Sequence, residues 1–117
     1  MSPTTFVLII VFVVLVVTNL PRRGRATSYQ DADHQGVVVY WRPGCTYCMR
    51  LRTRLRFTRL RYSEVNIWGD PEAAAFVRSV ADGNETVPTV TVAGKAMVNP
   101  SKSQVLEAVR THLDPQV

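Results

Sequence analysis

The stretch from Gly36 to Cys48 reads GVVVYWRPGCTYC, and it decides the fold. After Gly36 come five β-branched or aromatic residues, a continuous apolar run that is typical of a buried strand. Arg42-Pro43-Gly44 ends this run, and good helix formers follow from Thr46 to about Phe57. The pattern predicts a strand, a tight turn and a helix, with Cys45 at the junction.

The position of Cys45 favours redox chemistry. Free backbone N–H groups and the positive end of the helix dipole stabilise a thiolate at a helix N-terminus, and Arg42 adds positive charge nearby. A thiolate is the species that attacks a disulfide. Cys48 falls one turn later on the apolar stripe that it shares with Leu51 and Leu55. We therefore predict Cys45 as the nucleophile and Cys48 as its less exposed partner.

Other uses of a C-x-x-C pair are weaker. A zinc site needs four ligands, and only His34 and His112 could add to the two cysteines. A structural disulfide across so short a loop gives little stability. Two thiolates could carry a soft metal such as copper. A C-x-x-C that follows a strand and opens a helix is a stronger signal for redox exchange, and we predict no metal site.

The remaining pattern completes one small domain over residues 36–117. In chain order it predicts a strand at 60–67, a helix opened by Asp70-Pro71-Glu72 and closed by Gly83, strands at 86–92 and 95–98, and a last helix starting near 99–101. The order β-α-β-α-β-β-α needs a parallel pair and a hairpin. We expect an α/β, thioredoxin-like fold with a mixed four-stranded sheet and three helices.

Two local features have alternative interpretations. Pro88 in Thr86-Val87-Pro88 could simply begin a strand, or a cis bond could turn the Val87 backbone towards Cys45, where a thiol substrate would pair with it. At the last helix, Ser101 could form a capping box with Gln104, or Asn99 could be the cap with Pro100 as the first helical residue.

The N-terminal segment is strongly apolar. Residues 4–20 carry no ionisable side chain, which predicts a transmembrane anchor, with a cleaved signal peptide or a misassigned start codon as alternatives. Residues 21–35 are expected to form a polar, basic linker. Basic residues stay on the cytoplasmic side, and Arg22, Arg23 and Arg25 all follow the apolar run. This predicts a single-pass protein of the inner (cell) membrane with its C-terminal domain in the cytoplasm.

The chain is basic, with a net charge of +5 and twelve arginines. Seven of these lie between Arg42 and Arg61, around the cysteines, and no base-stacking motif accompanies them. We therefore expect no nucleic-acid partner. The arginines of the first helix could form a solvated face or could rest on anionic lipid headgroups.

Two motifs give the chain a family resemblance. Cys45-Thr46-Tyr47-Cys48 and Thr86-Val87-Pro88 resemble glutaredoxins. The run FVRSVADGNETVPTV from Phe76 to Val90, with Asn99-Pro100-Ser101 further on, is similar to mycoredoxins. The Gly-Asn-x-Thr-Val-Pro portion of that run is the most specific part.

The resemblance implies that the chain reduces mixed disulfides between proteins and mycothiol, a sugar-based thiol. It implies a nucleophilic Cys45, a cis Pro88 and no bound cofactor, with mycothiol as co-substrate and an NADPH-dependent mycothiol disulfide reductase to regenerate it. The substrate-binding residues expected on this basis are Arg42, Tyr47, Thr86, Val87, Pro88, Asn99 and Ser101. Two features depart from the family: Thr46 stands where mycoredoxins usually have Gly, and the apolar N-terminus is atypical.

The choice of mycothiol over glutathione rests mostly on this resemblance, and the segment before the last helix adds to it. Glutathione-using relatives usually carry a Gly-Gly-x-Asp type segment there, whereas this chain has Val98-Asn99-Pro100-Ser101-Lys102. The alternatives are a dithiol, thioredoxin-like reductase recharged by thioredoxin reductase and, outside enzymes, a membrane-bound metal carrier or assembly adaptor.

Overall fold

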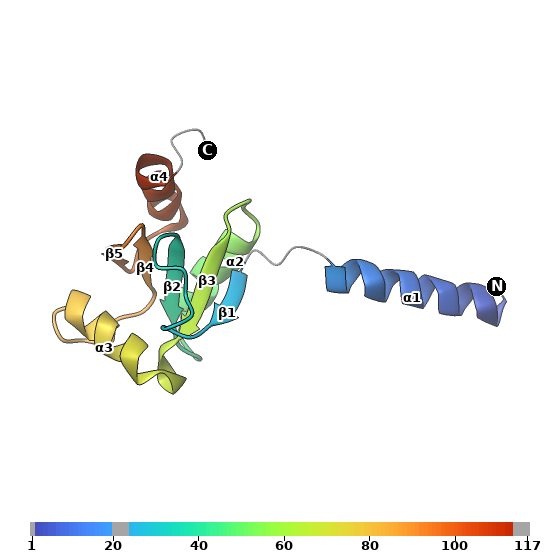
Figure 1. Ribbon diagram of the computed structural model, residues 1–117, viewed down its shortest axis with the longest axis horizontal. Coiled ribbons are helices and arrows are strands. Elements are labelled where there is room, and N and C mark those ends of the chain that lie inside the picture. The colour runs from blue at the N-terminus through green and yellow to red at the C-terminus, as the bar shows by residue number, and fades with distance from the viewer. Residues whose placement is uncertain (1, 20–23, 114–117) are drawn as a thin grey trace.

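The computed structural model describes residues 2–19 and 24–113 of the chain (Figure 1). Within these residues it forms ten elements. They are α1 (Pro3–Asn19), β1 (Gly24–Thr27), β2 (Val37–Trp41), α2 (Thr46–Arg56), β3 (Tyr62–Asn66), the 3-10 helix η1 (Ile67–Gly69), α3 (Pro71–Val80), β4 (Thr89–Val92), β5 (Lys95–Val98) and α4 (Lys102–His112).

The strands form one mixed sheet in the order β1-β3-β2-β4-β5. β3 lies parallel to both β1 and β2, whereas β4 lies antiparallel to β2 and β5. The prediction of a mixed sheet in a thioredoxin-like α/β fold is confirmed. The prediction of four strands was wrong, because β1 adds a fifth strand at the edge.

β1 also corrects the expected linker. Residues 21–23 lie outside the described part, but Gly24 to Thr27 pair with β3 from Tyr62 to Val65. Gly24 has a steric reason to be glycine, because a Cβ there would press against the side chains of Glu64 and Tyr62. From residue 24 onward, the segment expected to be a linker is therefore part of the domain.

The core lies on both faces of β2, since successive side chains of a strand point to opposite faces. Val37 and Val39 pack with the helices α2 and α4, in a cluster that contains Leu51, Leu55 and Val105. On the other face, Val38 and Tyr40 belong to the cluster that contains Ala73 and Val77 of α3. The continuous apolar run at 37–41 is thus explained by helices on both sides of the strand.

An ion pair fastens α2 to the sheet. Arg52 of α2 donates from Nε to the carboxylate of Glu64 on β3 at 2.7 Å, and its Nη2 lies 2.6 Å from the same oxygen. The guanidinium carbon also lies 3.7 Å from the ring centre of Trp41, the last residue of β2. A buried charge needs such a partner, and Glu64 is only 4% exposed. These contacts hold the helix that begins next to Cys45.

The helix starts agree with the expected caps. Asp70 accepts the Ala73 N–H at the start of α3. Ser101 caps α4 and forms the complete capping box with Gln104, so the alternative cap at Asn99 is wrong. The strand predicted at 86–92 begins only at Thr89, because Thr86-Val87-Pro88 turns with a cis bond before it.

α1 is an apolar helix that Figure 1 shows apart from the sheet. Its large apolar side chains, from Phe6 to Val17, are between 43% and 68% exposed. No helix among residues 2–19 and 24–113 combines the length and apolarity that a membrane crossing needs. The transmembrane helix predicted over residues 4–20 is therefore not confirmed, and residue 20 lies outside the described residues.

Asp70 provides a test of how the N-terminal part of the domain is held. Its carboxylate caps α3 and also accepts the Tyr29 backbone N–H at 2.7 Å. Asp70→Ala removes both bonds, so we expect a loss of about 1–2 kcal/mol in the free energy of unfolding, measured by urea denaturation. Glu107→Ala, which removes an exposed carboxylate paired with Arg110, should cost less than about 0.5 kcal/mol. Equal losses in the two variants would contradict this role of Asp70.

Candidate functional site

Cys45 is the N-cap of α2. Its backbone is extended, with φ −86° and ψ 112°, and its Sγ accepts the Cys48 backbone N–H at 3.3 Å. In the thiol form Sγ also donates to the Val87 carbonyl oxygen at 3.6 Å. An N-cap atom that accepts a helix N–H is stabilised further when it is negatively charged. The structure therefore places the Cys45 sulfur at the N-terminus of α2, in contact with a helix N–H.

Cys48 lies in a contrasting environment. Its side chain is fully buried, within the cluster that contains Val38 and Tyr40. Burial raises the pKa of the Cys48 thiol to about 12, and a hydrogen bond with Cys45 adds to the rise, while a backbone hydrogen bond and the charge of Arg42 oppose it. Cys48 is therefore a protonated thiol at neutral pH. Both cysteines are in the reduced, unpaired form.

The second part of the site is Thr86-Val87-Pro88, where the Val87–Pro88 bond is cis. Of the two alternatives left open above, the structure has the cis form, with the Val87 carbonyl beside Cys45. Asn99, with a left-handed φ of 52°, donates its backbone N–H to the Pro88 carbonyl at 2.7 Å. This bond ties the segment before α4 to the loop that faces Cys45.

Three of the other expected binding residues have exposed side chains. Arg42 and Thr86 are exposed, and Tyr47 is 61% exposed with the Arg50 guanidinium 5.9 Å from its ring centre. The Ser101 hydroxyl is part of the α4 cap, since it accepts the Gln104 N–H at 3.2 Å. The structure thus brings Cys45, Cys48 and the Val87–Pro88 loop together.

A cavity of about 240 Å³ lies between α2 and the start of α4. It is lined by Tyr47, Arg50, Leu51, Arg54, Asn99, Pro100, Ser101, Lys102 and Gln104. Tyr47, Asn99 and Ser101 were expected at the site from the sequence, whereas Arg50, Arg54 and Lys102 were not. For Arg50 and Arg54 the available signal was their spacing along α2, because residues 47, 50 and 54 fall on one helical face. Lys102 begins α4, and no local signal linked it to α2.

No cluster of three or more His, Cys, Asp or Glu side chains that could hold a metal ion occurs in the described part of the chain. The arrangement around Cys45 is suited to thiol–disulfide exchange. A helix N–H donates to the half-buried Cys45 sulfur, the buried neighbour Cys48 stays protonated, and a backbone carbonyl and cis proline border the reactive sulfur.

The contrast between the two cysteines predicts their alkylation. Because burial raises the pKa of the Cys48 thiol to about 12, this thiol stays largely protonated at pH 9, and burial also blocks access of the reagent. Iodoacetamide should therefore label reduced protein at Cys45, with little label on Cys48 between pH 7 and pH 9, as measured by peptide mass spectrometry. Guanidinium-unfolded protein, which should label at both, is the control. Comparable labelling of both cysteines in the folded protein would contradict the assigned burial.

Comparison with known proteins agrees with this geometry. The sequence pattern of the family described as Glutaredoxin matches residues 37–97. The chain is 46% identical over 70 residues to "Putative glutaredoxin Rv3198A" of Mycobacterium tuberculosis, a match that covers 59% of this chain and 83% of that protein. It is 34% identical over 74 residues to "Mycoredoxin 1" of Corynebacterium glutamicum, covering 62% of this chain and 91% of that protein.

Solved structures support the fold. The thioredoxin-like protein BC3987 superposes with a TM-score of 0.54 at 21% identity, over 62% of this chain and 97% of that chain. Malassezia sympodialis thioredoxin superposes with a TM-score of 0.54 at 17% identity, over 80% and 94% of the two chains. Because the family pattern spans β2, both cysteines and the cis-proline loop, the chain belongs to the glutaredoxin family of thiol–disulfide oxidoreductases.

Proposed function

We propose that this chain reduces mixed disulfides between proteins and mycothiol, with Cys45 as nucleophile and mycothiol as electron donor. The Cys45 thiolate attacks the mycothiol sulfur of the mixed disulfide and forms a new S–S bond to it. The old S–S bond breaks, and the electron pair leaves with the protein sulfur, which takes a proton from solvent. A second mycothiol then attacks the adduct, which frees Cys45 and yields mycothiol disulfide.

The observation that carries the thiol chemistry is the asymmetry between the two cysteines. Cys45 Sγ accepts a helix N–H, whereas Cys48 is buried with its pKa raised to about 12. An attacking thiol must be ionised, so Cys48 is a slow competitor for the adduct on Cys45. This favours resolution by a second mycothiol over formation of an internal disulfide.

Support for a sugar-based thiol comes from the backbone before α4. A glutathione carboxylate needs free N–H donors there, but the Asn99 N–H is bonded to the Pro88 carbonyl and the Ser101 N–H to the Gln104 side chain. Pro100, between them, has no N–H to donate. Three successive positions therefore offer no backbone donor. The 34% identity to the Corynebacterium protein named Mycoredoxin 1 points in the same direction.

The proposed cycle also defines the partners. Its substrates are protein mixed disulfides, and its product, mycothiol disulfide, needs a separate NADPH-dependent reductase. The chain needs no bound cofactor for this exchange, because both electrons travel through sulfur.

The test is coupled turnover of one protein mixed disulfide by wild type and two single variants. Cys45→Ser should reduce the rate to the uncatalysed level, because the nucleophile is lost. Cys48→Ser should stay within about threefold of wild type with mycothiol and its reductase, since a second mycothiol resolves the adduct. Turnover with glutathione and glutathione reductase should be much slower than with mycothiol.

Two outcomes would contradict parts of this proposal. Equal loss of activity in both variants, with recovery by thioredoxin reductase in wild type, would favour the dithiol alternative. Comparable or faster turnover with glutathione would overturn the choice of mycothiol while leaving thiol–disulfide exchange through Cys45 intact.

We further propose that α1 holds the protein at the cell membrane, with the domain in the cytoplasm. Twelve consecutive apolar residues from Phe6 to Val17 present exposed side chains, and burying them in lipid would remove a large apolar area from water. The arginines at 22, 23 and 25 follow this helix in the sequence, and their positive charge favours the anionic cytoplasmic surface of the membrane.

A membrane-impermeant thiol reagent tests this placement in intact cells. We expect no labelling of Cys45 before lysis and rapid labelling afterwards, with the protein recovered in the membrane fraction. A variant that carries Val11→Asp and Phe12→Asp should move to the soluble fraction. Labelling of Cys45 in intact cells would contradict the cytoplasmic placement.

A further inference from the structure

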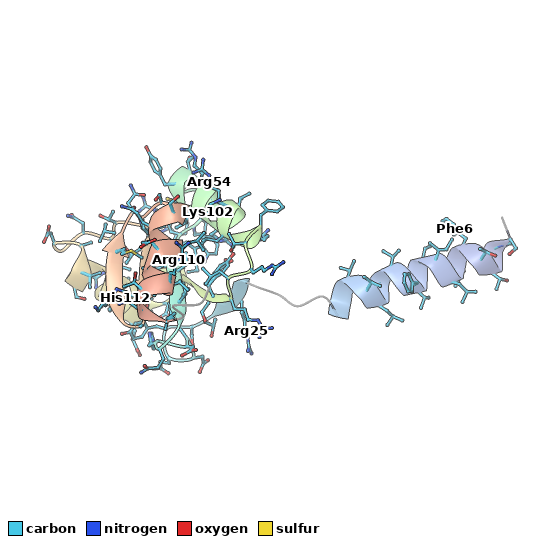
Figure 2. The ribbon with its side chains drawn as sticks, turned by 90° about the horizontal axis from the view of Figure 1, so that it is seen from above. Phe6, Arg25, Arg54, Lys102, Arg110 and His112 are labelled. Atoms are coloured by element: carbon cyan, nitrogen blue, oxygen red, sulfur yellow. The ribbon has the colours of Figure 1, made fainter. Side chains whose placement is uncertain are left out.

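The cavity between α2 and α4 carries an unbalanced positive charge. Arg50 and Arg54 project from one face of α2, and Lys102 is the first residue of α4. Figure 2 shows Arg54 and Lys102 on the same side of the domain, near the start of α4. All charged side chains that line this cavity are cations. None of these three residues belongs to an ion pair found among the described residues, which are Arg52–Glu64, Arg78–Glu85 and Arg110–Glu107.

This arrangement works against the local stability of the fold. A cation in the first turn of a helix opposes the helix dipole, and α4 has Lys102 there without an acidic residue in that turn. Arg50 and Arg54 are four residues apart on α2, where like charges repel. By contrast, Arg52 on the same helix is neutralised by Glu64. A local conflict of this kind, beside a reactive centre, indicates a charge that a binding partner would supply.

Under the proposed function, the partner that supplies this negative charge is one of the two halves of the mixed disulfide. A sugar-based thiol presents hydroxyl and amide groups, which do not call for three cations. The other half of the disulfide is a protein, whose side chains can carry carboxylates. We propose that the cavity binds an acidic side chain of the substrate protein, an inference that rests on the proposed thiol exchange. The cavity thereby selects mixed disulfides on cysteines that have Asp or Glu close by.

The distances along the helix fit this assignment. The cavity begins at Tyr47, two residues after Cys45, and Arg54 lies about 10 Å further along α2 at 1.5 Å per residue. An extended peptide advances about 3.3 Å per residue. A carboxylate about three to five residues from the modified cysteine can therefore reach the cations while its disulfide lies at Cys45.

The test uses two synthetic peptides, each with one cysteine in a disulfide with 2-mercaptoethanol. One carries Glu at the third and fourth positions after the cysteine, and the other carries Gln there. The rate at which the reduced full-length protein releases the peptide thiol is measured in a single turnover. This rate needs no mycothiol, so a failure of the mycothiol assignment would not affect the measurement.

Three proteins are compared. The cavity variant combines Arg50→Gln, Arg54→Gln and Lys102→Gln. The control variant combines Arg59→Gln, Arg61→Gln and Lys95→Gln, which removes the same charge from exposed positions outside the cavity lining. Comparing the two separates local binding from general electrostatic attraction. Circular dichroism of each variant checks that the fold is retained.

Wild type should release the Glu peptide about five- to tenfold faster than the Gln peptide at low salt, with a smaller preference at high salt. The control variant should keep most of this preference. The cavity variant should lose it and still react with the Gln peptide at close to the wild-type rate. Equal rates for the two peptides in wild type, or an unchanged preference in the cavity variant, would overturn the proposal. A further contradicting result is equal rates for the two peptides together with salt-sensitive binding of wild type to phosphatidylserine vesicles, if only the cavity variant loses that binding. The cavity would then bind lipid headgroups.

Discussion

The hydrogen bond from the Cys48 backbone N–H to Cys45 Sγ is the interaction on which the rest of the site depends. It exists because the chain changes from strand to helix within a few residues, so that the free Cys48 N–H in the first turn of α2 reaches the Cys45 sulfur. The same turn of helix buries the Cys48 side chain in the core. One turn of helix thus leaves the nucleophile half-buried and holds its partner in an apolar environment.

Much of the domain serves to hold that junction. Leu51 and Leu55 pack α2 onto one face of β2, and Arg52 joins the helix to Glu64 of β3 and to Trp41 at the end of β2. On the opposite side of the reactive sulfur, the Val87 carbonyl is held by the cis bond to Pro88 and by the Asn99 N–H bonded to the Pro88 carbonyl. Separate elements of the fold therefore hold Cys45 and the Val87 carbonyl next to each other.

The sequence indicated the fold where hydrophobic pattern and capping chemistry agree. The run at 37–41, the cap at Asp70 and the position of Cys45 were predictable, because each follows from local rules. The cap of the last helix was predicted only as Ser101 or Asn99. β1 was not, since Gly24–Thr27 is a polar edge strand whose pairing depends on close approach to Glu64 and Tyr62. The cationic cavity was also missed, because it joins one face of α2 to the start of α4, which lies about fifty residues later in the chain. Such long-range proximity depends on how the helices pack on the sheet.

The central claim is that exchange passes through a covalent adduct on Cys45 while Cys48 remains a buried thiol. The most direct measurement is to mix reduced wild-type protein with a protein–mycothiol mixed disulfide, quench with acid at short times and map the modified cysteine by mass spectrometry. Acid stops exchange because it protonates the attacking thiolates. We predict mycothiol on Cys45, with Cys48 unmodified at every early time point. Mycothiol on Cys48, or an internal Cys45–Cys48 disulfide that forms without any preceding adduct, would contradict the account.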